Sequence, residues 1–490
     1  MKKGIQYVKK PTGLLSENYK RKYNRALDLL SISGLEKIGT PGLETDLKRV
    51  RSTIDPKEQL TAARELVRQY SSHPLSHFQL AQSLHINSDP HEFEQMDRYG
   101  EVRRGWLEST GYGELGLEFI WAGMVLGSLG NHYTIESLLK ANQLGLRNAN
   151  KPVLLLPQKA RLRNPALFSY FEPHLNVVRD AEAIRTLRGL EFLLTLPLGI
   201  CLPMNDGCSF LDIAANRVEV ARREQGLDSA FFTLSDSHRE RGEQALQKLG
   251  LPRDAWYVTL HVREPGYRGE TRENSTENWR NANPLDYLKA CKIVTQAGGW
   301  VFRMGDPSMS PLPPMSQVVD YAHHKIRSDW MDVFLGATCR FCIGTGSGYY
   351  VIPFFFGVPR ILTNFPGFVP YFGMKNKDLY LPRWLKNIQT DELISFEEYI
   401  SPPIGNFWSL KHFRDAGLHW VENTPEELEA ATKEMLERTG DGLYSTLLDD
   451  DLQQRFKDLA EDCGKKYHGR PVKAFAPISQ DFLERHADLI

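Results

Sequence analysis

The feature that most constrains the fold is a regular alternation of short apolar segments and helical segments between residues 251 and 364. Each apolar segment is short enough for a buried strand, and the segments between them carry apolar residues at helical spacing. Consecutive strands joined by helices pair in parallel, so this part of the chain predicts a doubly wound α/β domain. The strands are expected at 257–262, 300–304, 340–343 and 360–364.

A second strand–helix unit precedes this domain. An apolar run at 119–126 leads into a glycine turn at 127–132, then a helical segment at 133–146 and an apolar strand at 153–156. This order also implies a parallel sheet, and glycines in the turn let backbone N–H groups approach a ligand at the start of the helix. We therefore expect two Rossmann-like domains. Tight packing explains such glycines equally well.

The amino-terminal hundred residues have a different character. Residues 18–104 are charged and helical in rhythm, and 60–70 and 77–84 predict two amphipathic helices joined by a short turn. The pair resembles a single tetratricopeptide hairpin, but no second copy follows at the spacing that a solenoid requires. We expect a helical cap or a module that docks a protein partner. The predicted boundaries are 1–110 for this module, 111–250 and 251–423 for the Rossmann-like domains, and 424–490 for closing helices.

The charge balance excludes whole classes of partner. Lys and Arg total 60 against 61 for Asp and Glu, so no global field draws the 490-residue chain to nucleic acid or to an anionic membrane. The six cysteines are scattered, which favours a reducing compartment, and the Cys339-x-x-Cys342 pair is interpreted as structural. The sequence shows no signal peptide and no apolar run long enough to span a bilayer. A cytoplasmic protein is expected.

A glycine-rich loop is the strongest candidate for ligand binding. Gly344, Thr345, Gly346, Ser347 and Gly348 follow one predicted strand and precede a helical segment that Pro353 should keep short. Ligands of open α/β sheets bind beyond the carboxyl ends of the strands. Backbone N–H groups and two hydroxyls there would suit a phosphate. The loop matches neither the P-loop nor the G-x-G-x-x-G pattern.

His261 and Arg263 form the second candidate element. They are two residues apart at the end of a predicted strand, so both side chains are expected on one face. Arginine can hold a diphosphate through paired hydrogen bonds and stabilise it as it leaves. An ion pair of these residues with Asp or Glu is the structural alternative.

These segments together resemble a known family. The sequence resembles the donor domain of GT-B glycosyltransferases, and it is more similar to a bacterial glycosyltransferase group related to protein O-fucosyltransferases with an H-x-R motif. The resemblance covers about 111–436 and is strongest at 257–364. It rests on His261-Val-Arg263, Arg303-Met-Gly-Asp306, Ile343-Gly-Thr-Gly-Ser-Gly348, Phe356-Gly-Val-Pro359 and the segment 421–428.

The resemblance implies two facing Rossmann-like domains, with the acceptor in the first and a nucleotide sugar mainly in the second. It implies that Arg263 holds the donor diphosphate, that the loop 345–348 cradles phosphate, and that Asp306 lies near the nucleotide. Gly130, Asn131 and His132 would face them across the cleft. Trp279, Arg280 and Asn281 could touch donor or acceptor. A GDP-sugar is mildly favoured as the donor.

Several points of the chemistry stay open. GT-B enzymes generally need no metal, and we expect neither a metal nor a cofactor here. The run Asp449-Asp450-Asp451 is interpreted as a solvated helix end. An inverting reaction needs a base for the acceptor hydroxyl. The candidates for that base are His132, His261, Glu264, Glu273, Asp306 and Asp320.

The predicted function is metal-independent transfer of a sugar from a nucleotide sugar to a glycan or protein. One alternative is a nucleotide-sugar 2-epimerase of the same fold. Another is a non-catalytic scaffold that binds partners through the helical module.

Overall fold

The computed structural model describes two compact units, Met1–Glu114 and Leu115–Ile490, each of which is described by itself. Described residues lie between 42 and 489. The gaps within this span are 54, 88, 90, 148–150, 228–229, 267–279, 366–374, 376, 402, 408–409, 441–450, 469–472 and 474–475. Glu273, Trp279, Asp449 and Asp450, which the sequence singled out, lie outside the described residues.

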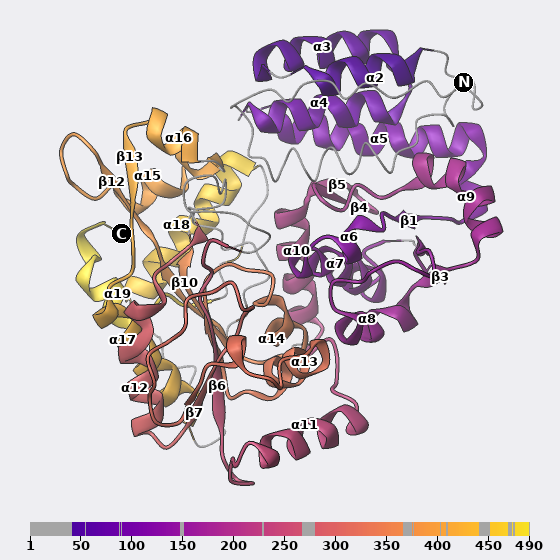
Figure 1. Cartoon of the computed structure of the whole chain (residues 1–490). Helices are drawn as coiled ribbons and strands as arrows, with labels where there is room; N and C mark the ends of the chain where they lie inside the picture. The colour runs from indigo at the N-terminus through magenta and orange to yellow at the C-terminus, as the bar shows by residue number, and fades with distance from the viewer. Residues whose placement is uncertain are drawn as a thin grey trace, which may run out of the picture. The chain divides into compact units, whose positions relative to one another are not determined.

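The first unit is helical, as expected. Asp55 caps the second of its helices by accepting hydrogen bonds at 3.0 Å from the N–H groups of Lys57 and Glu58, and Pro56 occupies the first helical position. The two helices predicted at 60–70 and 77–84 are present. The described helices are α2 (Leu43–Ser52), α3 (Pro56–Gln69), α4 (Pro74–Ile86) and α5 (Glu92–Thr110), drawn in indigo and violet in Figure 1.

The second unit begins with a small parallel sheet in the order β1-β2-β3. Its strands are β1 (Phe119–Ile120), β2 (Val153–Leu155) and β3 (Asn176–Val178). The strand expected at 119–126 is wrong in its second half, because Gly123–Leu126 form the short helix α6. Both conformations bury a short apolar run, so periodicity could not separate them.

The other elements of this first half surround that sheet. The 3₁₀ turn η4 (Leu129–Asn131) leads directly into α7 (His132–Gln143). The remaining elements are α8 (Pro165–Phe171), α9 (Ala181–Leu194), the hairpin β4 (Cys201–Met204) with β5 (Gly207–Phe210), α10 (Leu211–Glu224) and α11 (Asp236–Lys248).

A six-stranded parallel sheet organises the second half, in the order β11-β10-β9-β6-β7-β8. The predicted strands are confirmed with small shifts of their ends. In the register, His261 lies opposite Gly344, so the carboxyl ends of β6 and β9 adjoin. The strands are β6 (Tyr257–His261), β7 (Trp300–Arg303), β8 (Val318–Val319), β9 (Cys342–Gly344), β10 (Arg360–Phe365) and β11 (Leu379–Pro382).

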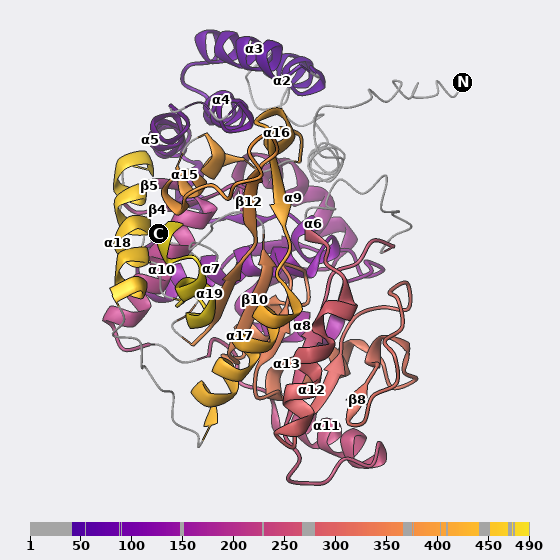
Figure 2. The ribbon, with the colours of Figure 1, turned by 90° about the vertical axis from the view of Figure 1, so that its left-hand side faces the viewer.

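Helices cover both faces of this sheet. One face packs Val258 and Leu260 into a core with α12 (Leu288–Gln296) and α17 (Pro425–Arg438). The other face packs Phe302 and Cys342 with α13 (Asp329–Thr338) and α14 (Val351–Phe355), in a core that continues into α7 and α8 of the first half. Figure 1 shows α12 and α17 on the opposite side of the sheet from α13 and α14, and Figure 2 looks onto the side of α12 and α17. The two halves of this unit therefore share one apolar core.

The carboxyl-terminal part closes the second half. Thr424 and Glu427 form the predicted capping box at the start of α17, with Thr424 Oγ1 accepting from the Glu427 N–H at 3.2 Å. Asp451 begins α18. The other elements are β12 (Trp384–Asn387), β13 (Leu418–Val421), α15 (Phe396–Ile400), α16 (Leu410–Asp415), α18 (Asp451–His468) and α19 (Gln480–Arg485). Among the described helices, none is long and apolar enough to cross a bilayer. The α/β class with parallel sheets and an extra helical module at the amino terminus is confirmed.

Candidate functional site

The candidate site lies where β6 and β9 end side by side. The backbone N–H of Arg263 donates a hydrogen bond of 2.9 Å to Thr345 Oγ1. Thr345 is buried, and the carbonyl of Gly344 beside it accepts from Thr363 Oγ1 at 3.2 Å. The start of the glycine loop is therefore held by β6 on one side and by β10 on the other.

His261 packs against this loop rather than facing open solvent. Its Nδ1 lies 3.0 Å from Ser347 Oγ, and its ring stacks on Tyr349 with centroids 5.5 Å apart and planes 14° apart. The pKa of His261 is lowered to about 4, mainly by burial and in addition by the positive charges of Arg303 and Arg263. The imidazole is neutral at pH 7.

Two arginines reach the loop from the segment that follows β6. Arg280 donates to the Gly346 carbonyl from both Nε, at 2.8 Å, and Nη2, at 2.5 Å. Arg263 donates from Nη1 to the side-chain oxygen of Asn281. Arg263, Arg280 and Asn281 are all only partly buried. The Arg280 guanidinium thus lies against the loop of small residues, and the Arg263 guanidinium lies beside the neighbouring Asn281, so positive charge gathers near a loop that could receive an anion.

Gly344 and Gly348 of the loop closely approach other segments of the chain. A Cβ on Gly344 would lie 2.9 Å from the carbonyl oxygen of His261. A Cβ on Gly348 would lie 3.3 Å from Leu129 Cβ and 3.4 Å from the Gly130 backbone nitrogen. The turn of the first half and the glycine loop of the second half are therefore in contact at this point, whereas the resemblance implied that they face each other across a cleft.

Asn131 and His132 differ in their surroundings. Asn131 is partly buried, and its carbonyl accepts from Thr134 Oγ1 at 2.9 Å. His132 begins α7 inside the core, with Nδ1 3.2 Å from the Leu129 carbonyl and its ring edge-on to Phe171. Burial lowers the pKa of His132 to about 4. Its Nε2 has no hydrogen-bond partner within the described part of the chain.

The carboxylate candidates are not equivalent. Arg303, which is fully buried, pairs with Glu264 at 2.5 Å and with Asp320 at 3.2 Å. Glu264 also accepts from the Ser310 N–H at 3.1 Å. Asp306 instead accepts a hydrogen bond of 2.9 Å from the Ser308 N–H and acts on the pKa of the His261 ring. Glu264 and Asp320 are therefore committed to holding the end of β7.

Some relationships could not be foreseen. Tyr349 belongs to the stacked pair with His261, and the sequence offered only an aromatic residue after a glycine loop. The hold of Arg280 on Gly346 joins positions 66 residues apart, which no local pattern reports. No group of three or more His, Cys, Asp or Glu side chains that could hold a metal ion occurs among the residues that the structure describes.

Comparison with known proteins gives weak likenesses to glycosyltransferases. No family model and no curated protein matches the chain. It is similar to a glycosyl transferase of family 9 from Veillonella parvula, at 10% identity and a TM-score of 0.39 over 66% of this chain and 98% of that one.

Two structures from E. coli are also similar. ADP-heptose lps heptosyltransferase II has 12% identity and a TM-score of 0.34, over 55% of this chain and 90% of that one. Heptosyltransferase WaaC with ADP has 12% identity and a TM-score of 0.28, over 67% and 99%. Similarity at this level identifies neither a family nor an activity for the chain.

Proposed function

We propose that the chain is a glycosyltransferase that uses a nucleotide-sugar donor. The observation that carries the proposal is the convergence of Arg263, Arg280 and the glycine loop at the carboxyl ends of β6 and β9. This edge is where open α/β sheets bind their ligands. The turn around Gly130 meets the same loop from the first half, which provides a second wall for an acceptor.

The proposed chemistry centres on the leaving diphosphate. When the bond from the anomeric carbon to the diphosphate oxygen breaks, the electron pair stays with the phosphate and negative charge accumulates there. Arg263 and the backbone N–H groups of the loop would stabilise that charge, because fixed donors gain most where charge develops. His261, neutral and bonded to Ser347, would act as a positioning residue for the loop.

Asp306 is the base that we propose for the acceptor hydroxyl. Glu264 and Asp320 are paired with Arg303, so their carboxylate oxygens are already engaged at the end of β7. His132 and His261 are buried, and their rings pack on Phe171 and Tyr349, so an acceptor hydroxyl reaches them less readily. Asp306 has a partly exposed side chain and is close enough to influence His261.

The donor base, the sugar and the acceptor are left for experiment. The H-x-R resemblance favours a GDP-sugar, and the two similar structures from E. coli are an ADP-heptose enzyme and an enzyme with ADP. A glycan or a protein could supply the acceptor hydroxyl. We propose that no divalent metal is needed.

Thermal-shift titration tests the proposal directly. GDP-, UDP-, CDP-, dTDP- and ADP-sugars would be screened with and without EDTA, and at least one should raise the unfolding temperature in both conditions. Arg263→Ala should remove that shift and lower turnover about 10²- to 10³-fold. Lys292→Ala is the matched control, because it removes an exposed positive charge from α12 in the same half.

Three outcomes would contradict the proposal. If no sugar nucleotide stabilises the chain, it does not bind such a donor. If nucleotide is released at the same rate without any acceptor, an epimerase explains the site better. If Arg263→Ala binds and turns over like Lys292→Ala, then the anion site is elsewhere.

A further inference from the structure

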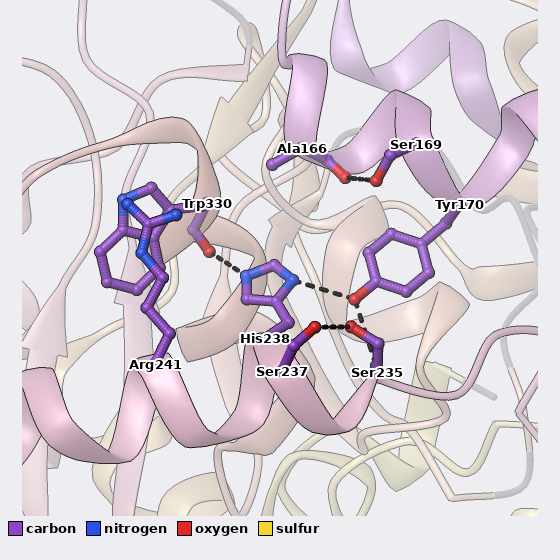
Figure 3. Close-up of a pocket in the computed structure, with 8 residues that line it drawn as sticks. All are labelled: Ala166, Ser169, Tyr170, Ser235, Ser237, His238, Arg241 and Trp330. Atoms are coloured by element: carbon purple, nitrogen blue, oxygen red, sulfur yellow. Dashed lines mark hydrogen bonds between the residues drawn. The ribbon is translucent and has the colours of Figure 1, made fainter.

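A hollow in the larger unit shares no residue with the candidate site. It has a volume of about 480 Å³ and lies among α8, α11 and α13. That size falls in the range of small-molecule sites. Figure 3 shows side chains from all three helices arranged around it. The lining residues are Ala166, Ser169, Tyr170, Ser235, Ser237, His238, Arg241 and Trp330.

His238 joins the three helices into one wall. Its Nδ1 lies 2.9 Å from the Tyr170 hydroxyl, and its Nε2 lies 2.7 Å from the Trp330 carbonyl. The Tyr170 oxygen also accepts from the Ser235 N–H at 3.4 Å. Both ring nitrogens are therefore occupied (Figure 3), and the wall is built before any ligand arrives.

Arg241 supplies a positive charge at one side of the hollow. Its side chain is exposed, and its guanidinium carbon lies 3.9 Å from the centre of the Trp330 ring, so the group rests on the indole. In the described part of the chain, Arg241 forms no ion pair with a carboxylate, and none of the lining residues is acidic. A guanidinium held in this way can bind an oxyanion through two parallel hydrogen bonds.

Hydroxyl groups complete the lining. Ser235 and Ser237 lie at the start of α11, where their hydroxyl oxygens are 3.5 Å apart, and Ser169 lies across from them on α8. Asp236 between the two serines is exposed and does not line the hollow. Serine and tyrosine hydroxyls both donate and accept hydrogen bonds, as the hydroxyls of a sugar require.

We infer that this hollow, called here the α8/α11/α13 pocket, binds a small sugar that carries an oxyanion, either a phosphate or a carboxylate. Arg241 would hold the oxyanion, and the hydroxyls of Ser169, Ser235 and Ser237 would hold the sugar ring. This inference stands apart from the proposed donor site, because Arg263 and the glycine loop have no part in it.

Isothermal titration calorimetry with defined probes tests the inference. Glucose 6-phosphate and glucuronate represent the two oxyanions, glucose is the neutral probe and inorganic phosphate is the bare anion. At least one of the two charged sugars should bind at least tenfold more tightly than glucose and than inorganic phosphate. Which of them binds identifies the oxyanion.

Variants localise the binding. Arg241→Ala should weaken the charged sugar at least tenfold without lowering the unfolding temperature, and Trp330→Phe should weaken it less. Arg239→Ala is the matched control on the same helix, because Arg239 is exposed and does not line the pocket. Arg263→Ala should bind the charged sugar like the unmodified chain.

Several results would overturn the inference. If glucose or inorganic phosphate bound as tightly as the charged sugars, the pocket would not recognise the sugar and the oxyanion together. Unchanged binding by Arg241→Ala would place the ligand elsewhere. If the Arg263→Ala variant no longer binds the charged sugar, that ligand occupies the proposed donor site instead. If no nucleotide sugar stabilises the chain but the charged sugar still binds the α8/α11/α13 pocket, only the proposed function is rejected.

Discussion

His261 Nδ1 lies 3.0 Å from the Ser347 hydroxyl, and this contact ties the last residue of β6 to the glycine loop that follows β9. His261 is 8% exposed and stands within the influence of Arg303 and Arg263, so a further positive charge on its ring would be repelled. A neutral imidazole can position the loop through its hydrogen bond to Ser347, while the arginines provide the positive charge for an anion.

The first prediction concerns acid. His261 and His132 each have a folded-state pKa of about 4, whereas an unfolded histidine has about 6.5. Between pH 4 and pH 6.5 the unfolded chain binds more protons than the folded chain. The stability that the two neutral histidines contribute should therefore be fully present above pH 6.5, and the free energy of unfolding should fall as the pH drops toward 4. Each histidine should contribute up to about 1.4 kcal/mol per pH unit.

Urea unfolding at pH 7 and pH 5 measures this effect. His261→Asn and His132→Asn should each show a smaller loss of stability between the two pH values than the unmodified chain. His419→Asn, which alters an exposed position, should show the full loss. An undiminished pH dependence in both buried-site variants would contradict the assignment.

The second prediction concerns the contact between Gly348 and the turn at Leu129 and Gly130. Gly348→Ala should cost about 1 kcal/mol, because the new Cβ is tighter than ordinary contact, and Gly348→Val should cost about 1–3 kcal/mol. Gly199→Ala is the control, since a Cβ there meets nothing within 4 Å. Urea unfolding would decide: equal stability of the Gly348→Val and Gly199→Ala variants would show that the two segments do not touch in solution.

The third prediction concerns a buried ion cluster in the first half. Lys140 pairs with Glu136 and, at 2.5 Å, with Glu219, and all three side chains are buried. Burial raises the pKa of Glu136, and Lys140 opposes that rise. Lys140→Met removes the ion-pair partner of two buried carboxylates and leaves Lys375 as the nearby cation that acts on both, so it should cost about 3–5 kcal/mol.

The matched control is Lys433→Met. Lys433 pairs with Glu429 at 2.6 Å on an exposed helix face, so its loss should cost less than about 0.5 kcal/mol. Adding Glu136→Gln to Lys140→Met should restore part of the lost stability. A Lys140→Met variant as stable as the control would mean that the cluster is solvated.

The fourth prediction concerns two thiols. Cys201 and Cys208 lie diagonally across the hairpin β4–β5, opposite Phe210 and Pro203 respectively, with their sulfur atoms 3.1 Å apart. Oxidation by diamide, which accepts both thiol hydrogens, should form a disulfide there. Peptide mapping after alkylation should recover the Cys201–Cys208 cross-link, and Cys208→Ser should abolish it. A digest in which both residues remain alkylated would contradict the prediction.

The alternation of strands and helices could be predicted from sequence because it is local. β6, β7, β9 and β10 each show as an apolar run between turn residues, and the cap of α17 shows as Thr424 with Glu427. Residues 123–126 were misassigned because a short buried helix and a short buried strand have the same apolar composition.

The candidate site was predicted in its parts. Strand order in a parallel sheet brings together segments that are far apart in the chain, so His261, Arg263, Thr345 and Ser347 could be placed at one edge by the rule for carboxyl ends. The neutral state of His261 and the hydrogen bonds from Arg280 to the Gly346 carbonyl could not be predicted, because they depend on burial and on contacts between distant residues.

By itself the sequence determined the α/β class, the helical module and the residue types gathered at the strand ends, since these follow from spacing along the chain. Only the tertiary structure decided which charges are paired. It joined Arg303 to Glu264 and Lys140 to Glu219, and it placed Arg241 on the Trp330 ring beside a hollow that both residues line. Coulombic and hydrogen-bond energies depend on distances and burial that exist only after the chain has folded.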